Sequence, residues 1–290
     1  MRLVTFKRHG NTLEEVGVWK KDGILPVNAT GCDYDSMNDL ICLATAEDLD
    51  AMQNATGPLL DFDEVKILSP IPRPMQDVLC LGLNYTEHAT EAAMYSKEAF
   101  SVGREAPVFF SKRVTYSQGS GDIIPAHADI TKRLDYECEL AVILGRDARD
   151  VKHEEVADYI FGYTVLNDVS ARDLQTTHKQ WYFGKSLDGF TPMGPCVVTA
   201  DEIAFPPKLK ISTTVNGELR QNSTTDLLIH DIPEIITTLT LGMTLKAGTI
   251  IATGTPKGVA MGMEEPVFLK PGDEIVCAIE GIGELINRVE

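Results

Sequence analysis

The sequence predicts an α+β fold that is mainly β, with a small N-terminal α/β domain and a larger C-terminal domain. Two observations carry this prediction. Short runs of β-branched and apolar residues, bounded by glycine, proline or asparagine, recur through the second half of the chain and are typical of strands. A stretch with three alternating prolines, residues 69–74, favours extended backbone and indicates a boundary. We therefore expect domains over residues 1–70 and 71–290.

The first 70 residues show both kinds of periodicity. Residues 1–6 read as an opening strand, and the runs 16–19 and 24–27 read as a hairpin. Apolar residues at helical spacing then predict short helices over 37–44 and 47–53. This part carries few residues suited to chemistry, so the function is expected in the main domain.

The main domain alternates many predicted strands with few helices. The best helix runs from Asp231 as N-cap to about Leu241, with Pro233 in its first turn and Gly242 at its end. Shorter helices are expected from residue 84 to 91 and from 152 to 158, and the polar stretch 95–106 is expected to be a mobile lid. The strands are expected at 78–81, 107–110, 122–125, 137–144, 161–166, 193–198, 209–215, 218–220 and 249–252, with a terminal pair around 280–283.

Composition excludes several classes of function. The formal net charge of −17 creates a field that repels nucleic acid and anionic membranes. The six cysteines are scattered, with no CxxC pair, which indicates a reducing compartment and no zinc site. Neither a targeting segment nor an apolar run long enough to span a bilayer is visible, so we expect a cytoplasmic protein without a membrane partner.

Three carboxylates are the strongest candidates for chemistry. Glu137 and Glu139 are two residues apart at the start of an apolar run, so on a strand they face the same side. Asp168 follows another apolar run, at or just past a strand end. Three carboxylate oxygens facing one point suit a hard divalent cation such as Mg²⁺ or Mn²⁺. The alternative is a solvated edge strand, which shows the same alternation.

Two further groups have both a catalytic and an ordinary interpretation. His88 and Glu91 lie on adjacent turns of the expected helix, where a carboxylate could orient an imidazole base, although a surface polar pair gives the same pattern. Lys185 stands in a Gly-Lys-Ser string, but Lys179 occupies the position of the first glycine of a phosphate loop. Lys185 could instead approach a ligand carboxylate or enolate, or simply be solvated.

Taken together, the motifs closely resemble the fumarylacetoacetate hydrolase family. The resemblance runs collinearly from about residue 70 to the C-terminus. It rests on Gly82-Leu83-Asn84-Tyr85 with His88 and Glu91, Leu134-Asp135-Tyr136-Glu137 with Glu139-Leu140, Asn167-Asp168-Val169-Ser170-Ala171-Arg172-Asp173, Gly184-Lys185-Ser186-Leu187-Asp188 and Thr253-Gly254-Thr255-Pro256.

The resemblance implies a mixed β-roll in the C-terminal domain, usually within a homodimer. It also implies that Glu137, Glu139 and Asp168 hold Mg²⁺ or Mn²⁺, although three carboxylates also accept Ca²⁺. The His88–Glu91 pair would lie on a helix that closes over the substrate.

Roles at the substrate follow from the same resemblance. Lys185 would bind or polarise substrate oxygens, and Gln175 and Thr255 would contact its carboxylates. Arg172 is also a candidate for substrate binding, although an arginine beside Asp168 could equally form a structural ion pair.

The function implied is cleavage of a carbon–carbon bond in a small anionic 2-oxo or 2,4-dioxo acid. Hydrolysis of an acylpyruvate or fumarylpyruvate and decarboxylation of oxaloacetate share an enolate that a cation and Lys185 can stabilise. An isomerase of the 2-hydroxyhepta-2,4-dienedioate type remains an alternative, as does a non-catalytic protein that binds its ligand through a metal.

Overall fold

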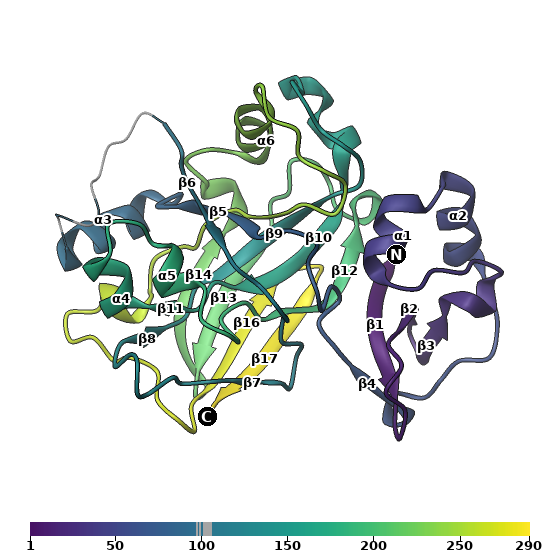
Figure 1. Cartoon of the computed structure of the whole chain (residues 1–290), viewed down its shortest axis with the longest axis horizontal. Helices are drawn as coiled ribbons and strands as arrows, with labels where there is room; N and C mark the ends of the chain where they lie inside the picture. The colour runs from purple at the N-terminus through teal and green to yellow at the C-terminus, as the bar shows by residue number, and fades with distance from the viewer. Residues whose placement is uncertain (97, 99, 101–105) are drawn as a thin grey trace.

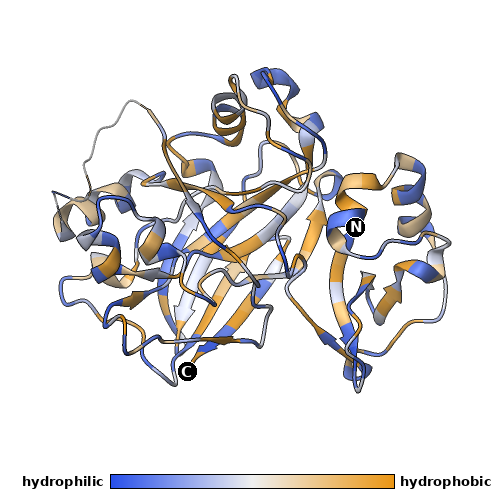
Figure 2. Ribbon diagram, in the orientation of Figure 1, coloured by the Kyte–Doolittle hydropathy of each residue, from blue (hydrophilic) through white to orange (hydrophobic). Residues whose placement is uncertain are grey.

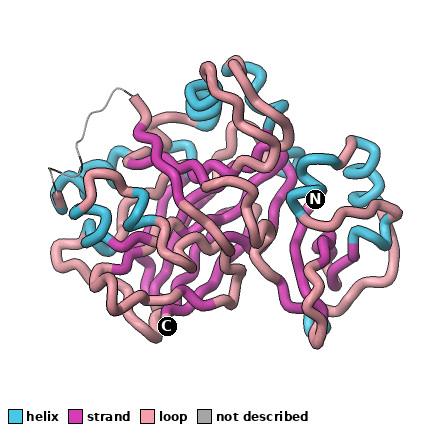
Figure 3. Tube along the Cα trace, in the orientation of Figure 1, coloured by secondary structure: helices cyan, strands magenta, loops and turns pink. Residues whose placement is uncertain are grey.

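A computed structural model describes residues 1–96, 98, 100 and 106–290, and in it two large sheets pack face to face. The stretch 95–106, expected to be a lid, lies mostly outside the described residues. The larger sheet runs through both predicted domains and the smaller one belongs to the C-terminal part (Figure 1). Helices lie at the periphery of the strands (Figure 3).

The larger sheet has ten strands. Its order is β3 (Gly23–Pro26), β2 (Glu15–Lys20), β1 (Arg2–Arg8), β12 (Met193–Thr199), β10 (Ile160–Asn167), β9 (Cys138–Leu144), β15 (Ile250–Ala252), β5 (Val78–Gly82) and β6 (Val108–Lys112), with β4 (Val65–Ile67) paired to β1. Most pairs are antiparallel, and β15 runs parallel to β5. The sheet is therefore mixed.

The second sheet has five strands and lies against the centre of the first. Its order is β14 (Glu218–Thr224), β13 (Lys210–Val215), β16 (Glu274–Ile279), β17 (Gly283–Val289) and β7 (Ile123–Ile124). Strands β13 and β16 contact β9, and β17 contacts β12. A separate pair joins β8 (Leu134–Asp135) to β11 (Ser170–Ala171).

The helices are short. They are α1 (Met37–Leu43), α2 (Ala46–Asn54), α3 (Thr86–Tyr95), α4 (Arg172–Thr177), α5 (Tyr182–Lys185) and α6 (Ile232–Thr240), with 3₁₀ helices η1 (Val27–Thr30), η2 (Phe62–Glu64), η3 (His153–Tyr159), η4 (Ala200–Glu202), η5 (Thr225–Leu227) and η6 (Ala260–Gly262). Among the described residues, no helix is both long enough and apolar enough to cross a membrane.

The main hydrophobic core lies between the two sheets. All seven residues of β9 are buried, because this strand has a paired strand on each side and the second sheet against one face. That position explains its nearly continuous apolar run, and Figure 2 shows apolar residues concentrated along the central strands. A polar residue inside β9 is therefore buried and needs a compensating interaction nearby.

Most of the predicted elements are confirmed. Helix α6 has Asp231 as its N-cap, whose side chain accepts the backbone N–H of Glu234 at 2.8 Å. The β13–β14 hairpin turns at Asn216 and Gly217, whose φ angles of 52° and 79° suit a tight two-residue turn. The local signals in these segments agree with the tertiary structure.

Three details differ from the sequence-based expectation. The helix expected at 152–158 is the 3₁₀ helix η3. Helices α4 and α5 were not predicted, since six and four residues are too short to show a period. Glu137 precedes β9, which begins at Cys138. Its place is fixed instead by the amide of Asp168, which donates to the Glu137 carbonyl at 2.8 Å.

The N-terminal segment shares a sheet with the rest of the chain. Strand β1 pairs antiparallel with β12, with Leu3 opposite Val197. At the right of Figure 1 this segment forms its own layer of strands and helices, yet its sheet continues into the main body. The boundary at residue 70 stays a prediction, and the pairing indicates that the two parts unfold together.

The two tryptophans can test that coupling, because Trp19 lies in β2 and Trp181 lies in the C-terminal part. Leu3 is completely buried, so Leu3→Ala is expected to lower the free energy of unfolding by about 2–5 kcal/mol. Urea titrations of Trp19→Phe and Trp181→Phe, each with and without Leu3→Ala, should show equal shifts in midpoint. A shift confined to the Trp19 signal would indicate two independent domains.

Candidate active site

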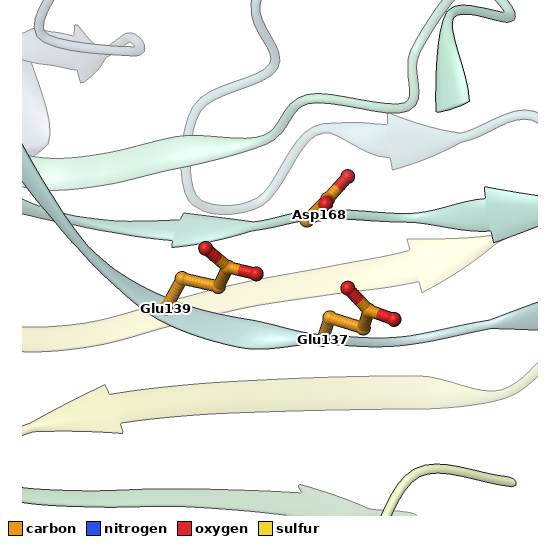
Figure 4. Close-up of side chains that lie close together, drawn as sticks. All are labelled: Glu137, Glu139 and Asp168. Atoms are coloured by element: carbon orange, nitrogen blue, oxygen red, sulfur yellow. The ribbon is translucent and has the colours of Figure 1, made fainter. Parts of the chain in front are cut away.

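The three predicted carboxylates come together at one buried point. Glu137, Glu139 and Asp168 each place one oxygen within 4.8 Å of the others. Figure 4 shows the two glutamates on one segment and the aspartate on the neighbouring one. Asp168 directly follows β10, and the β9–β10 pairing brings the two segments side by side. The spacing argument from the sequence thus identified the cluster.

One oxygen of each carboxylate is held by a protein donor. Arg172 Nη1 lies 2.7 Å from Glu137 Oε1, and the amide of Gly254 donates to Glu139 Oε2 at 2.7 Å. Lys112 Nζ donates to Asp168 Oδ1. Each of these contacts leaves the second oxygen of its carboxylate to other partners.

Lys185 bridges two of those remaining oxygens. Its Nζ lies 2.7 Å from Glu137 Oε2 and 2.7 Å from Asp168 Oδ2. Although it ends helix α5, it is only 2% exposed. Burial would lower the pKa of Lys185, but the charges of Asp168 and Glu137 outweigh burial and raise it, so the ammonium stays charged.

The electrostatics of the cluster favour a bound cation. Burial, followed by the charges of Asp168 and Glu137, raises the pKa of Glu139 well above its usual range. Burial also acts on Glu137, but the charges of Lys185 and Arg172 outweigh it and lower the pKa of that carboxyl. Glu139 is therefore the carboxylate without a cationic partner, and an oxygen-only donor set with one uncompensated charge fits Mg²⁺ or Mn²⁺.

Arg172 is fixed by a second carboxylate that faces away from the trio. Its Nε donates to Asp135 Oδ2 at 2.8 Å, and Asp135 also accepts the amides of Ala260 and Met261 at 2.8 and 3.0 Å. Within the described part of the chain, its buried Nη2 has no hydrogen-bond partner. Arg172 is thus held on one edge and has a free donor on the other.

The predicted pair His88 and Glu91 lies on α3, on adjacent turns as expected. His88 Nδ1 is 3.8 Å from Glu91 Oε2, beyond hydrogen-bond distance, and this buried nitrogen is unpartnered among the described residues. Glu91 instead accepts the amide of Gly258 at 3.1 Å. Close packing fixes its carboxylate, since a Cβ on Gly262 would lie 2.7 Å from its Cδ atom.

Gln175 and Thr255 also line the site, but both already have partners. Gln175 Oε1 accepts Arg172 Nη1 at 3.0 Å. The Thr255 hydroxyl donates to the Cys138 carbonyl at 2.9 Å and accepts Gln221 Nε2 at 2.8 Å. Their predicted contact with substrate therefore has to use the remaining amide group of Gln175 and the remaining lone pair of Thr255.

Several of these groups line one small cavity, which leaves about 10 Å³ open to the centre of a water molecule. Apolar side chains line the cavity together with the charged groups. Trp181 lies directly on Gly82, where a Cβ would approach its ring to 2.1 Å. The lining comprises Leu81, Gly82, Leu83, His88, Phe100, Phe110, Glu137, Glu139, Arg172, Gln175, Trp181, Lys185, Thr255 and Met261.

Sequence reasoning missed three residues that support the site. Lys112 and Asp135 are completely buried and hold Asp168 and Arg172. Gln221 joins Thr255 to Cys138, whose amide donates to Gln221 Oε1 at 3.1 Å. Two signals were available: Asp135 stands in the Leu134-Asp135-Tyr136-Glu137 motif, and Lys112 follows the aromatic run of β6 and shares a strand face with Phe110.

A mainly β fold that buries four carboxylates, two lysines and an arginine in one cluster beside a cavity is typical of an enzyme with an acidic active site. The family model described as fumarylacetoacetate (FAA) hydrolase C-terminal matches residues 77–290. The chain belongs to the fumarylacetoacetate hydrolase family, which confirms the resemblance, the fold class and an enzymatic function at the level of the family.

Named relatives refine this placement. Oxaloacetate tautomerase YisK of Bacillus subtilis is 46% identical over 231 residues, which are 80% of this chain and 75% of that protein. Mitochondrial oxaloacetate tautomerase Fahd2a of Rattus norvegicus is 41% identical over 235 residues, 80% of this chain and 72% of its own. The solved fumarylacetoacetate hydrolase of Exiguobacterium antarcticum is 41% identical, with a TM-score of 0.86 over 100% of this chain and 99% of its own.

Proposed function

We propose that this protein is a divalent-metal-dependent enzyme that interconverts the enol and keto forms of oxaloacetate or a closely similar small 2-oxo dicarboxylic acid. One observation carries the proposal: the carboxylate trio, the Lys185 ammonium that bridges two of its members, and Nη2 of Arg172, unpartnered among the described residues, lie together beside one cavity. The two tautomerases among the relatives support this choice of reaction.

Charge in the site favours a small dianion once a cation is present. Four buried carboxylates, including Asp135, face the cationic side chains of Lys112, Arg172 and Lys185, which leaves one negative charge in excess. A divalent cation reverses that sign and makes the site attractive to an anion, which the net charge of −17 would otherwise repel. The cavity is nearly closed, with about 10 Å³ open to the centre of a water molecule, so the substrate is expected to be short.

The chain's own groups divide the work between binding and proton transfer. A divalent cation held by Glu137, Glu139 and Asp168 would act as a Lewis acid on the 2-oxo group. Arg172 would bind a substrate carboxylate through Nη2, and Lys185 would stabilise negative charge on the enolate oxygen. His88, whose Nδ1 is unpartnered within the described residues, would carry the proton between oxygen and carbon, with Glu91 at 3.8 Å stabilising the imidazolium.

Carbon–carbon cleavage is the second candidate, and it is the reaction that the sequence alone favoured. It passes through the same enolate, and the observation in its favour is the proximity of Glu91 to a buried His88 at the cavity, an arrangement that can activate water. Hydrolysis of an acylpyruvate or fumarylpyruvate would need that water, whereas decarboxylation of oxaloacetate would not. As part of this proposal we retain Mg²⁺ or Mn²⁺ and the homodimer implied by the resemblance.

One assay panel tests the proposal. Enol oxaloacetate is mixed with enzyme and Mg²⁺ or Mn²⁺, and its disappearance is followed by ultraviolet absorbance while pyruvate is measured by a coupled assay. We expect ketonisation to be accelerated at least 10²-fold over metal alone, with no matching release of pyruvate, because general acid–base catalysis typically contributes 10²–10⁴-fold. Chelation by EDTA should remove the acceleration.

The other outcomes of the panel identify the alternatives. Stoichiometric pyruvate from oxaloacetate, or an acid and pyruvate from acetylpyruvate or fumarylpyruvate, would replace tautomerisation by cleavage. Migration of a double bond in 2-hydroxyhepta-2,4-dienedioate, followed by NMR in D₂O, would identify the isomerase. Binding of every acid without turnover of any would leave a ligand-binding protein.

A further inference from the structure

Two buried lysines contact Asp168 from opposite sides, and they are not equivalent. Lys112 Nζ donates to Asp168 Oδ1, to the Phe190 carbonyl at 2.6 Å and to the Val169 carbonyl at 3.2 Å. These three acceptors use all three N–H groups of the ammonium. Lys185 donates two of its three N–H groups to Asp168 and Glu137, and it lines the cavity.

We propose that Lys112 is a positioning residue that occupies Asp168 Oδ1, so that Asp168 offers a cation only Oδ2 and the site selects Mg²⁺ or Mn²⁺ over Ca²⁺. This inference rests on the cation site of the proposed function, but not on the reaction that it catalyses. Lys112 is completely buried and donates its three N–H groups to Asp168 Oδ1 and two backbone carbonyls, so it acts on the cation through Asp168.

The same arrangement recurs at the other two carboxylates. Arg172 holds Glu137 Oε1 and the amide of Gly254 holds Glu139 Oε2. Each carboxylate of the trio therefore has one oxygen fixed by these donors and could give a cation only the other, which for Glu137 and Asp168 requires Lys185 to give way. Three single oxygens would leave the rest of the coordination shell to water and substrate. Mg²⁺ and Mn²⁺ suit six-coordinate sites of this kind, whereas Ca²⁺ takes six to eight oxygens, often from bidentate carboxylates.

Lys112 is the donor whose removal should affect the choice of cation most cleanly. Without it, no other described residue donates to Asp168 Oδ1, and the carboxylate can rotate to present both oxygens. Removing Arg172 would also change the cavity wall, and the Gly254 amide belongs to the backbone. The relevant readout is the ratio of Ca²⁺ to Mg²⁺ dissociation constants, because loss of a buried positive charge tightens binding of every cation.

Titration calorimetry of the substrate-free protein measures that ratio for Mg²⁺, Mn²⁺ and Ca²⁺. In Lys112→Met we expect the affinity for Ca²⁺, relative to the affinity for Mg²⁺, to rise about tenfold or more. The matched control is Lys185→Met, which removes a buried charge from the other oxygen of Asp168 and should tighten all three cations without changing their ratio. An unchanged ratio in folded Lys112→Met, or the same change in both variants, would overturn the proposal.

Crystals of the parent protein grown with Mn²⁺ or with Ca²⁺ give a second test that does not depend on a variant folding. We expect Asp168 Oδ1 to remain on Lys112 Nζ with either cation, while only Oδ2 reaches the cation. A bidentate Asp168 with Lys112 displaced would contradict the proposal. Neither test uses a substrate, so failure here leaves the proposed tautomerisation standing, and failure of the tautomerase assay leaves this inference to be decided on cation binding.

Discussion

Replacing Glu139 with glutamine is expected to abolish cation binding and turnover while leaving the metal-free protein at least as stable as the parent. Glu139 has no cationic partner, and burial together with the charges of Asp168 and Glu137 raises its pKa well above the usual range. Glutamine keeps the oxygen that accepts the Gly254 amide and removes the disfavoured charge. Turnover should fall by a factor on the order of 10³ or more, since a Lewis acid is worth several kcal/mol.

Two measurements test this combination. Calorimetric titration with Mg²⁺ should show no binding to Glu139→Gln, and urea unfolding without metal should show equal or higher stability. A carboxyl whose pKa is higher in the folded than in the unfolded state destabilises the fold once the pH exceeds the unfolded-state pKa. The gain in stability from Glu139→Gln should therefore grow from acid toward neutral pH. Lower stability of Glu139→Gln at neutral pH would mean that its charge is compensated in the metal-free protein.

Asp168→Asn provides the contrast. It should also lose cation binding, but it removes the carboxylate shared by Lys112 and Lys185, both of them buried. Leaving buried ammonium groups without their partner typically costs about 3–5 kcal/mol. The two substitutions therefore separate a carboxylate kept for the cation from one that also supports the fold.

The parts of the site that the sequence could predict are those encoded locally. Glu137 and Glu139 are two residues apart beside an apolar run, and Asp168 follows another, so strand periodicity predicted a shared face for the glutamates. The β9–β10 pairing then brings Asp168 to them. His88 and Glu91 likewise follow from helical spacing. The order of strands in the sheet, by contrast, needed pairings such as β1 with β12 that span nearly 200 residues.

The supporting shell could not be predicted, because it depends on contacts between distant segments. Lys112 lies 56 residues from Asp168, and Asp135 lies 37 from Arg172. A lysine at a strand end looks the same in sequence whether it is solvated or buried. The hydroxyl of Thr255 also shows the limit, since its partners Cys138 and Gln221 come from two different sheets and only the folded chain reveals them.

Lys185→Met is expected to lower kcat by roughly 10²–10³-fold while tightening the binding of Mg²⁺. The ammonium bridges Glu137 Oε2 and Asp168 Oδ2, two of the oxygens that face the common point of the trio. It therefore neutralises charge that a cation would otherwise neutralise, so its removal leaves a more negative site. Turnover falls because no other described ammonium with a free N–H reaches the cavity to stabilise an enolate.

The same substitution should make stability depend strongly on metal. Without a cation, the Glu137 and Asp168 carboxylates lose a buried partner, which typically costs about 3–5 kcal/mol, and Mg²⁺ should recover most of that loss. Thermal unfolding with and without Mg²⁺ should thus show a larger metal-induced rise in Tm for Lys185→Met than for the parent. Lys66→Met, which removes an exposed lysine paired with Asp122 at 2.6 Å, serves as the control and should behave like the parent. Weaker Mg²⁺ binding by Lys185→Met would show instead that the lysine helps to hold the cation. The ammonium would then not replace the cation in neutralising the carboxylates.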